Sequence, residues 1–435
     1  MKITFLGAGS TIFAKNVLGD CILTPELSDF SISLHDIDEQ RLNESYNLIS
    51  TIAKNAGRNI QITKSLNRKE SLKGSNYVVN AIQVGGYDPC TITDFEIPKK
   101  FGLRQTIADT LGIGGIFRAL RTIPVMEEFA RDIEEVCPDA LLLNYTNPMS
   151  MLTGFMQRYT KVKTVGLCHS VQGCVPELFR TLKLEEYTDS CVWKIAGINH
   201  QAWLLEVKDK DGNDLYPEIK RRIEEENPDY DKNWDLVRHE LVRQLGYYVT
   251  ESSEHSSEYM PFFIKDKYPE LIERFNIPLD EYPRRCINQI AGWAEIRDKM
   301  LTPDFTHEKS HEYASYIIKS MHTNTPFSIH GNVLNNGLIT NLPQNACVEV
   351  QCMVDGKGIT PCYVGDLPEI CAAMNRTNIN VQLLTIEAAV TKKKAAIYQA
   401  AMMDPHTAAE LSIDDIRAMC DELIEAHGDW LPKYN

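Results

Sequence analysis

The segment MKITFLGAGS, residues 1–10, is the strongest indication of the fold class of this chain. The apolar run Lys2–Leu6 predicts a short buried strand, and a helix is expected to begin at Ser10. A turn that contains Gly7 and Gly9 lets backbone N–H groups approach a pyrophosphate at the start of that helix. We therefore predict a dinucleotide-binding strand–turn–helix unit, and a turn that merely needs glycine is the alternative.

The pattern of the first strand and helix continues through the first 150 residues. Short apolar runs alternate with amphipathic stretches, which predicts a parallel sheet with right-handed helical crossovers. The expected strands are 31–35, 59–63, 77–84 and 140–145, and the expected helices are 39–55 and 122–137. The fold class is therefore α/β, with an N-terminal Rossmann-like, doubly wound parallel sheet.

Polar residues at the ends of these strands are candidates for holding the nucleotide. Asp36 ends the second strand, where a carboxylate binds the ribose hydroxyls of NAD and repels the 2′-phosphate of NADP. Asp38 is the alternative. Gln83 and Gly85 end a later strand, and Ser10 lies where the phosphates would approach the first helix. We expect all of them except Asp38 to contact the cofactor.

The pattern changes in the second half of the chain. Residues 210–310 are rich in charge, proline and tyrosine, and a long helical region is expected from about 367 to 427. The other expected strands are 194–197 and 202–208, which look antiparallel, and 327–333, 348–352 and 361–363, which suggest a second small sheet. We predict a nucleotide-binding domain over residues 1–195 and an α+β substrate and metal domain over 196–435.

Cys168 and His200 form a candidate metal pair. Each follows a short apolar run, in GLCHS and AGINHQ, so that each side chain lies at a strand end. A thiolate and an imidazole suit a divalent transition metal, and two protein ligands leave positions open for substrate. A buried cysteine and a hydrogen-bonded histidine are the alternative. The twelve cysteines form no CxxC pair, which is typical of reduced thiols.

A polar cluster, TESSEHSSEY over residues 250–259, is a second candidate site. Its titratable side chains share faces at helical spacing, although a solvated helix face is the alternative. Asp109 precedes a glycine-rich turn and Asn147 precedes Pro148, and each is either a turn residue or a ligand contact.

Composition excludes several classes of partner. The formal net charge of −15 disfavours nucleic acid and anionic membranes, and no run approaches the ~20 apolar residues of a membrane span. Because the N-terminus enters a strand directly, no signal peptide is expected. We expect a cytoplasmic enzyme that acts on a small molecule.

Eight ordered motifs carry a resemblance to a known family: GAGS, QVGGY, ADTLGIGGIFRALRTIP, LNYTNPM, GLCHSVQG, GINHQAW, ESSEHSSEY and AAMMDPHTAA. Together they resemble glycoside hydrolase family four, whose members need NAD and a divalent metal, over essentially the whole chain. Within that family the α-galactosidase type is the most similar. The resemblance implies a lactate/malate dehydrogenase-like fold, Mn²⁺ as the metal, and a homodimer or homotetramer.

The resemblance also implies a mechanism outside the two-carboxylate routes of ordinary glycosidases. NAD⁺ takes hydride from C3 of the sugar, and the ketone acidifies the proton on C2. The metal chelates the C2 and C3 oxygens, a base removes the C2 proton, and the glycosidic oxygen leaves. Water then adds at C1 and NADH returns the hydride, so the net reaction is hydrolysis.

Residue by residue, the resemblance assigns Cys168 and His200 to the metal and Asn147 to the substrate. His169 stands where phosphosugar-specific relatives carry the proposed acid, so the leaving-group acid and substrate contact here is His169, or a water replaces it as the acid.

Tyr259 lies near the position of the base, and Asp109 matches a residue that assists the base. His255 and Ser253 are rival candidates for the base, and Arg284 and Arg285 are expected to reach a substrate hydroxyl.

The sugar is less tightly specified. Asp94 lies in the segment where phosphosugar relatives place a phosphate-binding arginine, and its charge would disfavour a 6-phosphate or a uronate. An α-galactoside is therefore expected, with α-glucosides and α-galacturonides as alternatives. A simple NAD-dependent dehydrogenase and a non-catalytic sugar or nucleotide sensor are the rival classes.

Overall fold

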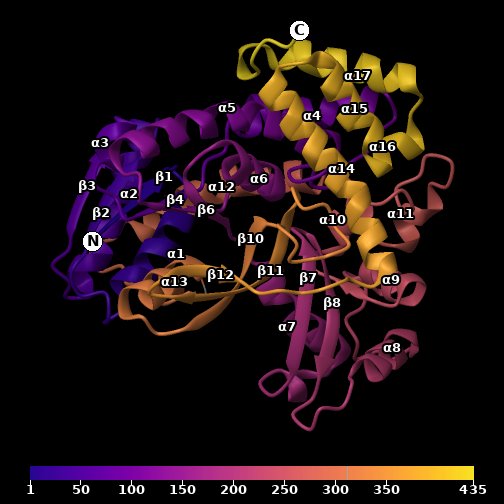
Figure 1. The fold of residues 1–435 in the computed structure, drawn as a ribbon, viewed down its shortest axis with the longest axis horizontal. Coiled ribbons are helices and arrows are strands. Elements are labelled where there is room, and N and C mark those ends of the chain that lie inside the picture. The colour runs from indigo at the N-terminus through magenta and orange to yellow at the C-terminus, as the bar shows by residue number, and fades with distance from the viewer. Residues whose placement is uncertain (311) are drawn as a thin grey trace.

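The computed structural model describes residues 1–310 and 312–435. Its centre is a mixed sheet of twelve strands (Figure 1). Six strands are parallel, in the order β3 (Gln61–Ser65), β2 (Ser31–His35), β1 (Lys2–Leu6), β4 (Tyr77–Asn80), β5 (Leu141–Asn144) and β6 (Lys163–Gly166). This 3-2-1-4-5-6 order is that of the Rossmann fold, so the predicted fold class is confirmed.

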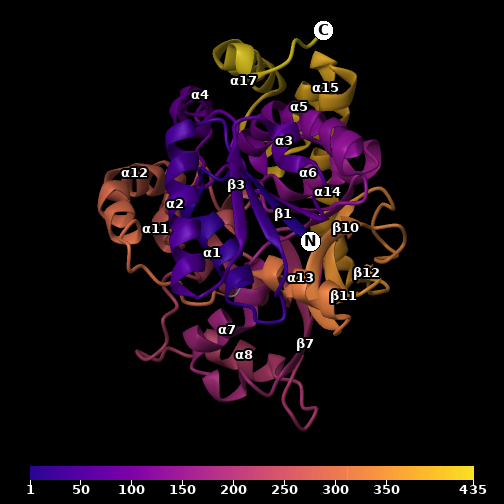
Figure 2. The same ribbon diagram turned by 90° about the vertical axis from the view of Figure 1, so that its left-hand side faces the viewer.

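Helices cover both faces of the parallel strands. Figure 2 shows α1 and α2 on one side of them and α5 and α6 on the other. The helices of this part are α1 (Thr11–Ile22), α2 (Glu39–Asn55), α3 (Arg68–Leu72), α4 (Ile92–Lys100), α5 (Gly112–Val136) and α6 (Met149–Tyr159), with a π-helical turn at Gly86–Thr91. Apolar side chains of both layers and the sheet form one continuous core.

The start of α5 differs from the prediction. The expected helix over 122–137 begins ten residues earlier, at Gly112, within the stretch read as a glycine-rich turn. A Cβ atom on Gly114 would lie 2.5 Å from the carbonyl oxygen of Ala108, and one on Gly115 would lie 2.6 Å from the carbonyl carbon of Thr110. Gly114 and Gly115 therefore serve the close approach of the preceding loop to the helix, whereas Gly112 has a left-handed backbone, with a φ of 73°, at the start of α5.

The second half of the chain extends the same sheet. Its strands are β7 (Val192–Ile198), β8 (Gln201–Lys208), β9 (Tyr248–Val249), β10 (Phe327–Leu334), β11 (Cys347–Asp355) and β12 (Gly358–Pro361). The prediction of a separate small sheet is wrong, because β10 pairs antiparallel with β6 at Asn332 and Gly166. Strand β11 in turn pairs with β7 at Glu349 and Gly197. A single cross-sheet row, Gly166–Asn332–Glu349–Gly197, therefore joins the two halves.

The remaining helices surround these strands. They are α7 (Ser170–Leu182), α8 (Tyr216–Glu224), α9 (Leu236–Leu245), α10 (Ser253–Glu258), α11 (Glu270–Arg274), α12 (Glu281–Met300), α13 (Tyr313–Thr323), α14 (Glu369–Thr391), α15 (Lys394–Met403), α16 (Pro405–Glu410) and α17 (Ile413–His427). A second apolar cluster lies between the β7–β8 hairpin, α7 and α8. None of the helices in the described part of the chain combines the length and apolar character that a bilayer span requires.

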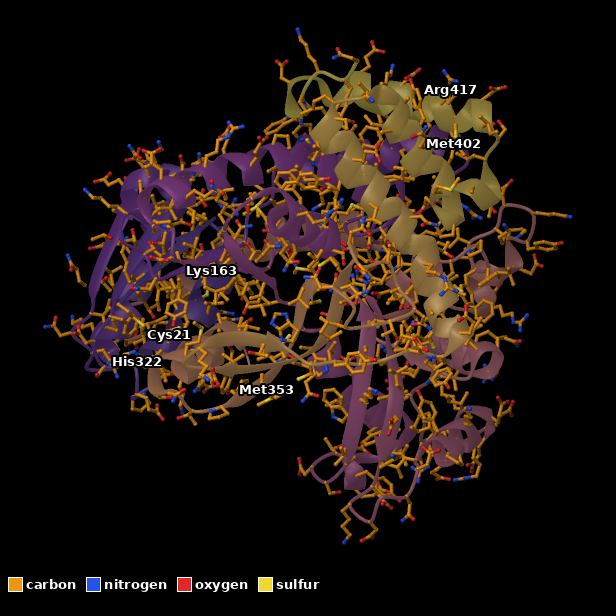
Figure 3. All side chains as sticks on the ribbon, in the orientation of Figure 1. Cys21, Lys163, His322, Met353, Met402 and Arg417 are labelled. Atoms are coloured by element: carbon orange, nitrogen blue, oxygen red, sulfur yellow. The ribbon has the colours of Figure 1, made fainter. Side chains whose placement is uncertain are left out.

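The C-terminal helices pack against the nucleotide-binding half. Arg417 of α17, labelled in Figure 3, lies at the C-terminal end of the molecule. Its guanidinium lies over the ring of Tyr398 of α15, and α17 packs on α4. Beneath them, the buried guanidinium of Arg121 on α5 pairs with both carboxylate oxygens of Asp94 on α4, at 3.1 and 2.7 Å. His427 Nε2 lies 2.9 Å from Asp94 Oδ1. This buried triad connects the neighbouring helices α4 and α5 to α17, which lies near the other end of the sequence.

Replacement of Arg121 by methionine should strongly destabilise the fold. The change leaves the buried carboxylate of Asp94 without its cationic partner, which typically costs about 3–5 kcal/mol. Urea unfolding followed by circular dichroism would measure the loss. Arg131→Met is the matched control, because its side chain is 69% exposed and its pair with Glu127 lies on the surface. Equal stability of the two variants would contradict a structural role for the triad.

Candidate active site

The turn after β1 has the geometry of a dinucleotide site. Gly7 has a φ of 83°, and a Cβ atom there would lie 2.8 Å from the carbonyl oxygen of Ala81. The N–H of Gly9 donates to Asp36 Oδ2 at 2.6 Å, which places the carboxylate directly beside the turn. Asp38 instead caps α2 through the N–H of Arg41, so its carboxylate is already used. Of the two aspartates, Asp36 is the one in contact with the glycine turn.

The other predicted nucleotide contacts lie around this turn. Ser10 is exposed at the start of α1, and its side chain makes no capping hydrogen bond. Gln83 is exposed in the loop after β4, and Gly85 has a φ of 79°, in close contact with the side chain of Cys90. Arg121 Nε donates to the carbonyl oxygen of Val84 at 3.1 Å, so the buried triad also holds this loop.

Cys168 and His200 meet as predicted from their strand ends, and Glu251 joins them. One ligand atom from each of the three side chains lies within 4.8 Å of the other two. His200 Nε2 lies 3.3 Å from Glu251 Oε2. A thiolate, an imidazole and a carboxylate in one cluster form a donor set that fits a divalent transition metal and leaves coordination positions open.

Backbone strain accompanies the cluster. His200 lies in the two-residue turn between β7 and β8 and has a φ of 62°, as does Glu251. Ala108, which precedes Asp109, has a φ of 53°. Non-glycine residues seldom adopt this left-handed region, and such strain concentrates at functional sites. The fold therefore holds three elements of the site in costly conformations.

The environment of His200 favours its charged form. Burial lowers the pKa of the imidazole, but the charges of Glu251 and Cys168 outweigh burial and raise the pKa to about 10. The other ring nitrogen, Nδ1, lies 3.1 Å from the hydroxyl of Tyr259. A cation that replaces the proton on Nε2 would satisfy the same two acidic neighbours.

A second group of side chains surrounds Asp109. Asn147 Nδ2 donates to Asp109 Oδ2 at 3.3 Å, and His255 Nε2 lies 3.7 Å from Asp109 Oδ1. Arg118 Nε donates to the carbonyl oxygen of Asn147. Burial would raise the pKa of Asp109, but the adjacent imidazole of His255 and the charge of Arg118 hold it well below its usual range. His255 in turn lies 4.9 Å from His200 between ring centroids, which connects this group to the metal cluster.

Glu258 positions the loop that carries Asp109. Its carboxylate accepts hydrogen bonds from the backbone N–H groups of Thr106, Ile107 and Ala108, at 2.8 to 3.3 Å. Burial nevertheless raises the pKa of Glu258 to about 7, because three neutral donors do not replace full hydration. Helix α10 therefore holds the loop at one end and presents His255 to Asp109 at the other.

His169, Ser253 and Arg284, three of the predicted site residues, form hydrogen bonds or ion pairs outside the groups described above. His169 Nε2 lies 2.7 Å from Glu312 Oε2, and this hydrogen bond raises the pKa of the imidazole. Ser253 instead bonds to buried Asp235. Arg284 donates to the carbonyl oxygen of Leu279 and pairs with Glu281.

Arg285 pairs with Glu254 and Glu281. The prediction that Asp94 repels an anionic sugar is wrong, because Asp94 is buried and forms an ion pair with the guanidinium of Arg121. Its carboxylate also contacts His427.

Three residues of the site were missed from the sequence: Arg118, Glu312 and Glu349. Arg118 is a buried cation within the glycine-rich motif, and the two charges of Arg118 and Arg121 among mostly apolar neighbours on α5 were an available signal. The sequence contains no such signal for Glu312 or Glu349, because each contacts its partner, His169 or Asn332, only when separate segments of the chain pack together. Glu349 lies in the row that joins the two halves of the sheet, where Asn332 Nδ2 donates to it at 2.9 Å.

The fold belongs to the class of malate dehydrogenase-like α/β proteins. The malate dehydrogenase of Plasmodium falciparum in complex with NADH superposes with a TM-score of 0.52 at 14% identity, over 90% of this chain and 99% of that chain. The 6-phospho-β-glucosidase of Thermotoga maritima, solved with manganese, NAD⁺ and glucose-6-phosphate, superposes more closely, with a TM-score of 0.79 at 21% identity over the whole of both chains.

Sequence comparison identifies the family within this class. Residues 2–184 match the family 4 glycosyl hydrolases, and residues 195–407 match their C-terminal domain. A protein of Bacillus subtilis named α-galactosidase is 62% identical over 100% of this chain and 99% of its own length. The chain therefore belongs to the family 4 glycosyl hydrolases and is a glycoside hydrolase, which confirms the resemblance seen in the sequence. The division of the chain at residue 195 and the individual site residues stay predictions.

Replacement of Glu349 by glutamine should flatten the pH dependence of stability. Burial raises the pKa of this carboxyl from its ordinary value of 4.5 to about 7. Between these values the folded state keeps a proton that the unfolded state loses, so stability is greatest below 4.5 and falls as the pH rises to 7. The effect is about 3 kcal/mol for 2.5 pKa units.

Urea unfolding of the metal-free protein at pH 5 and pH 7.5 would measure this difference. Exposed Glu206→Gln is the control and should keep the slope of the native protein. An unchanged slope in Glu349→Gln would show that another group causes the dependence.

Proposed function

We propose that this chain hydrolyses α-galactosides, with NAD and Mn²⁺ or another divalent transition metal as cofactors. One observation carries the proposal: Cys168, His200 and Glu251 converge at the sheet whose first strand ends in the dinucleotide turn. When bound, the two cofactors supply hydride transfer and Lewis-acid polarisation at the sugar. The choice of galactose is supported by the 62% identical relative, with α-glucosides and α-galacturonides as alternatives.

The chain's own residues have separate roles in this proposal. Cys168, His200 and Glu251 hold the cation, and Gly7 and Asp36 bind the nucleotide. Ser10, Gln83 and Gly85 complete the nucleotide contacts.

Tyr259 removes the proton from C2 of the sugar, and its position is supported by two contacts. Its hydroxyl lies beside His200, and its carbonyl oxygen accepts a hydrogen bond from Asn378 of α14. Burial raises the pKa of the phenol well above 10, so Tyr259 acts as a base only with a positive charge nearby. His255 is the rival candidate, because it also lies beside His200.

The remaining contacts position the sugar and the leaving group. Asn147 binds a sugar hydroxyl, and Asp109 orients Asn147 and His255. His169, whose pKa is raised by its hydrogen bond to Glu312, donates a proton to the leaving oxygen. We further propose that the enzyme is cytoplasmic and forms a homodimer or homotetramer.

Hydrolysis of p-nitrophenyl α-galactoside should require both cofactors. Protein stripped of metal and nucleotide is assayed with NAD⁺, Mn²⁺ and a reductant, added singly and together. Cleavage is expected only with both cofactors, and NADH should not accumulate because the hydride returns to the sugar. In D₂O the released galactose should carry deuterium at C2, which mass spectrometry detects.

Each other outcome of this assay points to a different conclusion. Steady production of NADH would indicate a simple dehydrogenase, the activity of the malate dehydrogenase that shares this fold. Cleavage of the α-glucoside or the α-galacturonide alone would leave the mechanism in place and change the substrate. Cleavage without NAD⁺ would contradict the mechanism itself.

Replacement of Tyr259 by phenylalanine should lower kcat by about 10²- to 10⁴-fold, the usual contribution of a general base. Deuterium exchange at C2 should fall in parallel, while KM changes little. If Tyr259 only orients His200, the main effect is instead weaker binding of Mn²⁺, measured by electron paramagnetic resonance. His255→Ala, tested in the same way, separates the two candidate bases.

A further inference from the structure

Helix α12 carries an apolar stripe that faces solvent. Only two of its twenty residues, Cys286 and Met300, are buried. Ile287, Ile290, Ala291 and Ala294 follow the i, i+3, i+4, i+7 spacing of a single helix face, and all four are exposed, Ile290 to 62%. Figure 2 shows α12 at the outer margin of the molecule, beside α2 and α11.

The stripe is suited to close helix packing. Ala291 and Ala294 have small side chains, and both are exposed. Small residues let two helices approach at the short end of the usual 8–10 Å axial separation. Isoleucines on the same face supply the apolar area that such a contact buries.

Charges at the two ends of the stripe identify the occupant. Arg284 lies seven residues before Ala291 and Asp298 lies seven residues after it, and both are exposed on the same side of the helix as the stripe. Within the chain, Arg284 pairs with Glu281 and Asp298 pairs with Arg297, and both pairs lie on the surface. If a second copy of α12 packs antiparallel across Ala291, each Arg284 faces Asp298 of the other copy. A parallel arrangement would instead place like charges together. The stripe is therefore complementary to itself under a two-fold axis.

We propose that α12 is a self-association surface, on which two copies of this chain pack antiparallel about an axis near Ala291. The inference gives the proposed oligomer a specific interface and does not depend on the proposed reaction. It also gives Arg284 a place at this interface. An anionic membrane is a poor occupant, because the chain has a net charge of −15.

Light scattering after size-exclusion chromatography gives the first test. The native chain of 49.4 kDa should have at least twice that mass at micromolar concentration. Ile290→Glu should halve the mass, because the interface would bury an unpaired charge. Ile296→Glu is the matched control: it lies on the opposite side of the same helix, is also exposed, and should leave the mass unchanged. Circular dichroism checks that both variants fold.

Two further variants test the symmetry. Arg284→Asp should weaken association at least tenfold by placing two acids together, and the double variant Arg284→Asp/Asp298→Arg should restore it. Ala291→Cys should form a disulfide-linked dimer under mild oxidation, whereas Ile296→Cys should not.

The proposal is overturned by a monomeric native protein, by an unchanged mass of Ile290→Glu, or by equal cross-linking of the two cysteine variants. None of these results affects the hydrolysis assay, so failure of the interface and failure of the proposed reaction are distinguishable.

Discussion

The site depends on one line of contacts across the sheet, the row Gly166–Asn332–Glu349–Gly197. Cys168 lies two residues beyond one end of this row, and His200 lies three residues beyond the other. A Cβ atom on Gly166 would lie 2.9 Å from that of Asn332, so the approach of β10 to β6 requires a residue without a side chain. Because the two halves of the chain share one sheet at this row, the candidate metal ligands Cys168 and His200 lie close together although they come from separate strands.

Local sequence signals located much of this arrangement. Apolar runs that end in glycine, aspartate or cysteine mark the strand ends, and Asp36, Cys168 and His200 could be placed because a strand end is a local property. Glu251 was recognisable only as part of a polar cluster. Its approach to His200 depends on the left-handed backbone of both residues, which no local preference favours.

Features that depend on distant pairing were not predictable. The sequence around Asp94 does not indicate that Arg121 or His427 lies nearby. The carboxylate was therefore expected to be unpaired, whereas in the structure it contacts both residues. The strands β10, β11 and β12 likewise show an ordinary alternation of apolar and polar residues. This alternation does not specify which edge of which sheet they join. Buried acids such as Glu258 and Glu349 show the same limit, since only the packed fold determines which N–H groups reach them.

The Asp94–Arg121–His427 triad has a consequence for the order in which the protein matures. Its acid and its cation lie in the first third of the chain, and its histidine ends α17. During synthesis, the first two groups leave the ribosome long before the third. The loop held by Arg121 therefore acquires its full support only after α17 has been made, so the nucleotide-binding half matures together with the C-terminal helices although its strands are made first.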